Sequence, residues 1–215
     1  MPDGVVADLT APGGWKLQAD VPDGIFSLAV EADDEAAAAE HASFADRCMP
    51  LLLRASGDVP QDAERLRADL ITQLSAMRQA VKATGMSYLG AVAGPHQDRT
   101  ALIVLGVGAM PMEFPAAVDP ASLLAALARH RYPGAAVEEF ETLSGTGVGI
   151  RRCESQPGPF GETDENAGVA EALVPFPEAG LLGAVTGYSY TTAGIDLAAA
   201  FAAVIACRMR AVSIA

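Results

Sequence analysis

The sequence is poor in cysteine, basic residues and aromatic residues, and each scarcity excludes a class of protein. Only three of its 215 residues are Cys, too few for a small scaffold held together by disulfides. Its 14 basic side chains face 27 acidic ones, so a net charge of −13 excludes a nucleic-acid binder that relies on phosphate contacts. Aromatic residues make up 6% of the chain, and Trp15, Phe26 and Tyr88 are expected to be core or sheet-face aromatics rather than a ligand stack.

Long apolar runs are also missing. The most apolar stretch, residues 195–207, is interrupted by Asp196 and falls short of the roughly 20 residues that span a bilayer. The N-terminal residues carry neither a basic segment nor a long apolar run, so no secretory signal is expected. We therefore expect a soluble cytoplasmic protein that binds neither nucleic acid nor membrane. Its cysteines are expected to be reduced thiols: Cys48, Cys153 and Cys207.

What the chain does have is apolar content, at 51% of its residues, which is ample for a buried core. The clearest helix is predicted over residues 61–84. There, Leu66, Leu70 and Leu74 recur at the spacing of one helical face. The charged side chains of this segment, Arg78 among them, are expected largely on its other faces, away from the core.

Three further helices are expected. The Ala-rich start of residues 34–53 favours a helix, which Pro50 should break. Asp119 is suited to cap a helix over residues 120–131 that begins with a proline. The last helix is predicted over residues 194–210, where an acid in the first turn and two arginines in the last complement the helix dipole.

The remaining apolar stretches are expected to be strands, joined in pairs by short turns rich in Pro, Gly and Asp. Such turns place consecutive strands side by side and antiparallel. With the helices packed on this sheet, the predicted fold class is α+β: an antiparallel β-sheet flanked by helices in an α/β/α sandwich. The expected strand pairs are 15–20 with 25–30, 86–93 with 100–108, 137–143 with 147–153, and 169–176 with 181–190.

Two segments are expected to lie outside the core. Residues 1–14 contain three Gly and two Pro and are predicted to form a flexible N-terminal arm. Residues 155–168 are polar and rich in Pro and Gly, which favours a surface loop. The remaining chain, residues 15–215, is expected to fold as a single α+β domain.

The sequence shows no established catalytic pattern. The glycines at 145–149 lack the lysine of a phosphate-binding loop and lie between two expected strands, which favours hairpin glycines over a ligand contact. His41 and His130 are expected on helix surfaces, and no His or Cys lies near them at metal-ligand spacing. No catalytic, metal-ligating or cofactor-binding residue is therefore predicted, and no cofactor. Residues distant in sequence, for example Cys48 with His130, can still converge in space.

One segment favours contact with another protein. Met110, Met112 and Phe114 lie in a stiff, Pro-containing apolar loop between an expected strand and an expected helix. Methionine-rich surfaces adapt to varied partners, and exposed apolar patches mark interaction sites. These three residues are the predicted partner-binding site. The alternative is that Met110 and Phe114 fold back onto the core.

Two parts of the chain resemble a known family. Trp15-Lys-Leu-Gln-Ala-Asp-Val-Pro-Asp-Gly-Ile-Phe-Ser-Leu is similar to the opening strand pair of the PsbP-like α/β/α sandwich superfamily. The predicted hairpin 169–190 and helix 194–210 are similar to its closing elements. The chain also resembles small cytoplasmic proteins of actinobacteria with this layout, and its Ala- and Arg-rich, Lys-poor composition fits a high-GC genome. The resemblance implies docking onto partner proteins, and it carries no catalytic residues over.

Three hypotheses follow from these patterns. The favoured one is a non-catalytic, protein-binding adaptor or chaperone-like protein, of the kind that serves secretion or a multiprotein assembly. The second is a structural protein that self-associates, as a homodimer, through a sheet edge or the loop 110–115. The third is a small-ligand binder or enzyme whose site converges from distant residues.

Overall fold

The computed structural model describes residues 5–11, 14–55, 62–96, 99–154, 167–189 and 194–214. The helices in these ranges are α1 (Asp34–Ala55), α2 (Ala63–Ala83), α3 (Pro120–Arg131), α4 (Ile195–Cys207) and the short 3-10 helix η1 (Pro177–Ala179). The strands are β1 (Val5–Ala11), β2 (Trp15–Val21), β3 (Phe26–Leu28), β4 (Met86–His96), β5 (Arg99–Pro111), β6 (Ala136–Thr142), β7 (Gly145–Glu154), β8 (Ala167–Phe176), β9 (Leu181–Ser189) and β10 (Arg210–Ser213).

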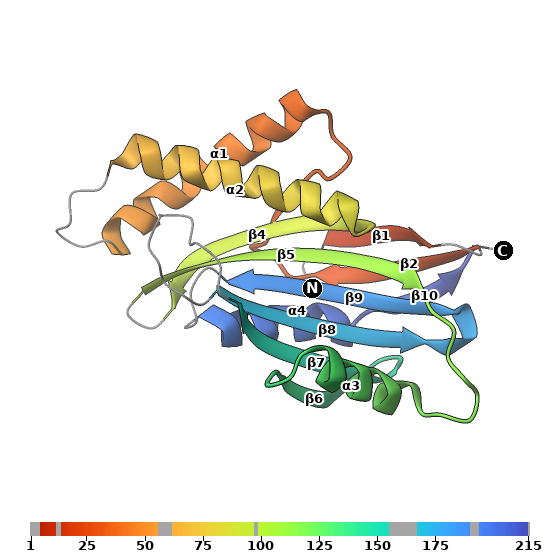
Figure 1. Cartoon of the computed structure of the whole chain (residues 1–215). Helices are drawn as coiled ribbons and strands as arrows, with labels where there is room; N and C mark the ends of the chain where they lie inside the picture. The colour runs from red at the N-terminus through yellow and green to blue at the C-terminus, as the bar shows by residue number, and fades with distance from the viewer. Residues whose placement is uncertain are drawn as a thin grey trace.

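The strands form two antiparallel sheets (Figure 1). A large sheet has the order β3-β4-β5-β9-β8-β7-β6, and a small sheet has the order β1-β2-β10. The predicted hairpins β4–β5, β6–β7 and β8–β9 are confirmed by their strand pairing. The fold class is therefore α+β with an antiparallel sheet flanked by helices, as the sequence predicts.

The first predicted hairpin is wrong. β2 pairs with β1 and β10 in the small sheet, whereas β3 pairs with β4 at the edge of the large sheet. The reason lies in the inward side chains of β2, because Leu17, Ala19 and Val21 are fully buried against the large sheet. Burying them requires β2 to cross over that sheet rather than extend it. The fold therefore contains two packed sheets, not the single layer that the turns suggest.

Three helices cover one face of the large sheet, and α4 with the small sheet covers the other (Figure 1). β5 shows this division, because its side chains alternate between the two faces. Leu102 and Val104 pack with α1 and α2, whereas Ile103 and Leu105 pack with α4 and β2. α3 lies on the α1–α2 face, where Leu182 of β9 packs against it.

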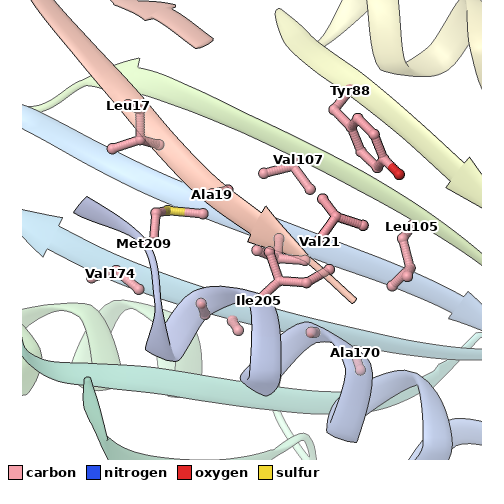
Figure 2. Close-up of a cluster of buried hydrophobic side chains, with 14 of the residues drawn as sticks. Leu17, Ala19, Val21, Tyr88, Leu105, Val107, Ala170, Val174, Ile205 and Met209 are labelled. Carbon is pink, nitrogen blue, oxygen red and sulfur yellow. The ribbon is translucent and has the colours of Figure 1, made fainter. Parts of the chain in front are cut away.

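The core between the two sheets and α4 holds the largest apolar cluster (Figure 2). Leu17, Leu105, Ile205 and Met209 are fully buried in it. Burial of each such side chain stabilises the fold by about 1.5–3 kcal/mol relative to exposure. α4 approaches β9 closely at Gly187, where an added Cβ would lie 3.1 Å from the carbonyl oxygen of Ala198. Packing of α4 on this face is thus set by a glycine.

The helices over residues 61–84 and 120–131 form where the sequence predicts them. The Asp62 side chain accepts a hydrogen bond from the Arg65 amide at 3.0 Å and caps α2. Asp119 caps α3 in the same way, by accepting from the Ser122 amide at 2.8 Å. Each cap satisfies an amide that the helix leaves unpaired and stabilises its helix by about 1 kcal/mol.

Three chain segments differ from the sequence prediction. Pro50 does not break α1, because it lies on the exposed side, where water can hydrogen-bond the carbonyl that loses its amide partner. The predicted N-terminal arm contains β1, which pairs along the whole of β2. The last helix ends at Cys207 rather than residue 210, because the chain then turns to pair β10 with β2. Most of the predicted loop 155–168 lies outside the described residues.

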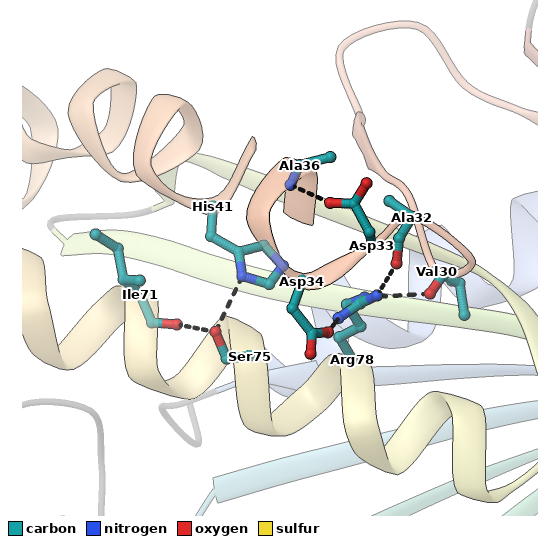
Figure 3. Close-up of polar contacts among 9 residues, drawn as sticks. All are labelled: Val30, Ala32, Asp33, Asp34, Ala36, His41, Ile71, Ser75 and Arg78. Carbon is teal, nitrogen blue, oxygen red and sulfur yellow. Dashed lines mark hydrogen bonds and ion pairs between the residues drawn. The ribbon is translucent and has the colours of Figure 1, made fainter. Parts of the chain in front are cut away.

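Two polar residues are buried between α1 and α2, although the sequence places both outside the core (Figure 3). Arg78 is only 3% exposed and donates hydrogen bonds to the carbonyls of Val30 and Ala32. His41 is also buried, and its Nδ1 lies 3.1 Å from the Ser75 hydroxyl. The helical periodicity was misleading here because two helices pack side by side, so a second face of each becomes buried.

Candidate partner-binding groove

The structure separates the three predicted partner-binding residues. Met110 is 42% exposed near the end of β5. Met112 and Phe114 are half-buried and pack against the apolar cluster under α3. The Met112 amide donates to the Gly180 carbonyl at 3.0 Å, which ties this segment to the β8–β9 turn. Met110 alone therefore stays open to a partner, and whether the three residues bind one stays a prediction.

An apolar groove lies on the other side of the β8–β9 turn. It has a volume of about 470 Å³ and opens between the small sheet and the ends of β8 and η1. Trp15 and Ala211 line it from the small sheet, Pro175 and Phe176 from β8, and Pro177 from η1. Phe176 belongs to the main core and Trp15 packs against it, so the groove is the open end of the layer between the two sheets. Its lining includes two aromatic side chains.

The groove runs beside a free strand edge. β10 is the last strand of the small sheet, and the Ile214 amide donates to the Gly14 carbonyl at 2.8 Å. Because hydrogen-bonded pairs alternate in an antiparallel ladder, Val212 and Arg210 also face β2. The amides and carbonyls of Ala211 and Ser213 therefore point outward. In the described residues no strand pairs with them.

Just before β10, two backbone carbonyls already accept hydrogen bonds, one at the end of α4 and one in the connection to β10. The Leu143 amide donates to the Cys207 carbonyl at 3.0 Å, and the Ser144 hydroxyl donates to the Met209 carbonyl at 3.1 Å. Both donors belong to the β6–β7 turn. The turn thus marks where pairing along this edge stops and where the open part begins.

Exposed apolar side chains surround the open part. Leu143 at the tip of the β6–β7 turn is 77% exposed, and Val212 and Ile214 also project into solvent. The edge strand β6 of the large sheet carries three exposed acids, Glu138, Glu139 and Glu141. Charge of one sign along an edge discourages strand addition. Of these two edges, β10 is therefore the one suited to binding another chain.

The residues considered for catalysis do not converge. Cys48 is buried among apolar side chains of α1 and α2, and burial raises the pKa of its thiol to about 12. His130 is exposed near the end of α3 and does not belong to that cluster. The Cys207 thiol donates to the Glu141 carbonyl at 3.3 Å. Within the described ranges, no group of three His, Cys, Asp or Glu side chains is arranged to hold a metal ion.

The glycines of β7, and two further glycines in β5, serve packing and turns. Gly145 begins β7 at a φ of +116°, a value that favours glycine, directly after the β6–β7 turn. Gly106 and Gly108 of β5 leave room for Met86, since a Cβ at Gly108 would lie 2.8 Å from the Met86 Cα. These contacts are structural.

No protein-family model matches the chain, and no curated protein matches it. The resemblance to the PsbP-like superfamily therefore stays a prediction. None of the helices in the described ranges combines the length and apolar character needed to cross a membrane.

The groove is not predictable from the sequence because β10 is not. Arg210–Ser213 is only four residues long and follows directly after a helix, so it shows no measurable alternation. Trp15 was expected as a core or sheet-face aromatic, and it does pack against the core. Trp15 also lines an open groove, and this follows only from the crossing of the two sheets. The one sequence feature that pointed to this site was that the chain contains a single Trp.

Proposed function

We propose that the protein is a non-catalytic adaptor that binds a partner protein through an extended segment of the partner's chain. The segment pairs with the free edge of β10 and places side chains in the groove beside Trp15. The supporting observation is that the outward amides and carbonyls of Ala211 and Ser213 lie next to an aromatic groove.

Strand addition would use both parts of this surface, the free edge of β10 and the groove beside Trp15. Backbone hydrogen bonds to an exposed edge supply affinity for any extended chain, and pockets for alternate side chains supply selectivity. Trp15, Phe176 and the flanking prolines favour an apolar or aromatic side chain. Arg210 and Glu178 at the groove allow a polar residue beside it. The partner segment is thus expected to alternate apolar and polar residues.

The overall charge favours a basic partner. A chain with a net charge of −13 attracts positively charged proteins from a distance and repels acidic ones. The groove itself holds one arginine and one glutamate, so charge guides the approach rather than the docking. Faster association at low salt is the corresponding kinetic signature.

The experiment uses the single Trp as its reporter. Peptides are selected from a displayed random library on the immobilised full chain and then titrated while Trp15 fluorescence is followed. We expect selected peptides to alternate apolar and polar residues and to change the emission in a saturable way. Selection of no peptide, or of peptides that leave Trp15 emission unchanged, contradicts the proposal.

A proline substitution tests the edge itself. Ala211→Pro removes an outward amide while leaving the amides that face β2 in place. We expect it to abolish peptide binding, and Ser213→Pro to do the same if Ala211→Pro unfolds the chain. The matched control is Leu127→Ala, an exposed apolar residue on α3, which should bind like the wild type. Equal peptide affinity in the folded proline variants overturns the proposal.

The same experiment separates an adaptor from a self-associating protein. Light scattering over a range of concentrations should give the mass of one chain for the wild type. A dimer that Ala211→Pro converts to a monomer would instead assign the β10 edge to a second copy of this chain.

A further inference from the structure

A second cavity, unrelated to the groove, has an unusual charge for so acidic a protein. It has a volume of about 670 Å³ and lies between the end of α3, the end of β7 and the start of α4. Three arginines line it, Arg131, Arg151 and Arg152, against a single acid, Asp196. Its size falls within the range of pockets that hold small molecules.

Arg151 is held in place but keeps one donor free. Its Nη1 lies 2.9 Å from Oδ1 of Asp196, and its Nη2 lies 3.6 Å from Oε2 of Glu138. Its Nε is buried and has no hydrogen-bond partner among the described residues. The guanidinium is thus held at the cavity wall, where its positive charge favours an oxyanion.

Arg152 is fixed from two sides. Its Nη1 lies 2.8 Å from Oε2 of Glu171 in a largely buried ion pair, and its Cζ lies 4.3 Å from the centre of the Tyr132 ring. Arg131 lies near the same ring, at 5.4 Å, and in the part of the chain that the structure describes it pairs with no carboxylate. Arg131 therefore contributes an uncompensated positive charge to the cavity.

The start of α4 faces the same space. Ile195 and Asp196, in the first turn of α4, line the cavity. The unpaired amides and the helix dipole make this end electropositive. Asp196 sits at this end and pairs with Arg151 through its carboxylate.

We propose that this cavity binds the phosphate groups of a phosphorylated small molecule. The phosphate accepts hydrogen bonds from Arg151 and Arg131 and lies at the start of α4. In binding, it takes the position on Arg151 that the Asp196 carboxylate holds in the unbound protein. Asp196 is thus a competitor within the chain, and its removal strengthens binding.

The test measures binding to the full chain by titration calorimetry, with pyrophosphate and ATP as probes and sulfate as the control for non-specific anion binding. We expect saturable binding of at least one phosphate probe and much weaker binding of sulfate. No heat with either phosphate probe, or equal affinity for sulfate, overturns the proposal.

Three variants make the assignment specific. Arg151→Gln and Arg131→Gln should each weaken the phosphate probe by about tenfold, the usual effect of losing a charge-assisted hydrogen bond. Asp196→Asn should strengthen it. Arg65→Gln, an exposed arginine on α2, is the matched control and should change nothing. Because Arg131 makes no ion pair in the described residues, its variant stays informative even if Arg151→Gln fails to fold.

An unchanged affinity in the Arg131→Gln and Asp196→Asn variants would place the phosphate elsewhere and contradict the proposal. Neither substitution touches β10 or Trp15, so this outcome is independent of the partner-binding groove.

Discussion

Arg78 of α2 and Asp34 at the start of α1 form an ion pair at 2.9 Å in which the arginine is buried and the aspartate is 91% exposed (Figure 3). The pairing holds the pKa of the Asp34 carboxyl below its usual range, chiefly through the hydrogen bond from Arg78. The same guanidinium binds the carbonyls of Val30 and Ala32. One side chain thus fixes the segment that leads from β3 into α1.

Replacing Arg78 is therefore expected to destabilise the chain more than its charge alone suggests. Arg78→Met leaves two carbonyls without their donor and should reduce the free energy of unfolding by roughly 2–4 kcal/mol. Arg65→Met, which removes an exposed pair with Asp69, is the control and should change it little. Urea denaturation measures both. Equal stability of the two variants would contradict the role given to Arg78.

His41 predicts a specific pH dependence. Burial, with the nearby Arg78 charge, lowers its pKa from 6.5, while Glu40 acts in the opposite sense. Between the lowered pKa of the folded chain and 6.5, His41 is therefore protonated in the unfolded chain but not in the folded one. The free energy of unfolding should fall as the pH drops below 6.5 and should be at its full value above it.

The measurement compares the wild type with His41→Gln from pH 7 to about pH 5, above the range in which ordinary carboxyl groups titrate. The neutral glutamine should flatten this part of the stability profile. The neighbouring groups that can contribute are Glu40 on α1 and Arg78 and Ser75 on α2. An identical slope in the two proteins would show that His41 does not take up the proton.

Two glycines of one hairpin are expected to respond differently to alanine. At Gly108 the added Cβ would meet the Met86 backbone at 2.8 Å, and Gly108→Ala should cost about 1–3 kcal/mol. At Gly94 nothing lies within 4 Å of the added Cβ, so Gly94→Ala should be tolerated. Thermal unfolding of both variants checks the close approach of β4 and β5. The reverse order of stability would contradict the described packing.

The three thiols are expected to differ in reactivity. Cys153 is exposed, Cys207 is half-buried and donates to Glu141, and Cys48 is buried with a pKa of about 12. Because the thiolate is the reactive form, iodoacetamide should modify Cys153 first and Cys48 only on unfolding. Mass spectrometry of the native protein gives the order. Early modification of Cys48 would show that α1 and α2 separate readily.

The sequence predicted local structure better than the arrangement of layers. Leu66, Leu70 and Leu74 lie on the buried face of α2, and Asp119 caps α3, because both signals depend only on residues close in sequence. The place of β2 depends on which surface buries Leu17 and Val21, and this is decided by distant strands. A turn at 21–24 is compatible with either a hairpin or a crossing between sheets.

The candidate site was less predictable for the same reason. Trp15 and Phe176 are 161 residues apart and meet only because the small sheet packs on the large one. Met110, which the sequence places in a loop, lies in β5 and is 42% exposed, so its place in the fold also depended on strand pairing. Arg151 and Arg131 carry no sequence pattern that distinguishes them from other surface arginines. Their common cavity arises from the place where α3 ends beside β7.

The most direct test of the account is amide hydrogen exchange at Ala211 and Ser213, with and without a peptide selected on the protein. In the free protein both outward amides should exchange rapidly, while the inward amide of Val212 is protected by β2. Binding of the peptide should slow exchange at Ala211 and Ser213 and leave β6 unchanged. Exchange at these two amides that stays fast in the complex would contradict partner binding by strand addition to β10.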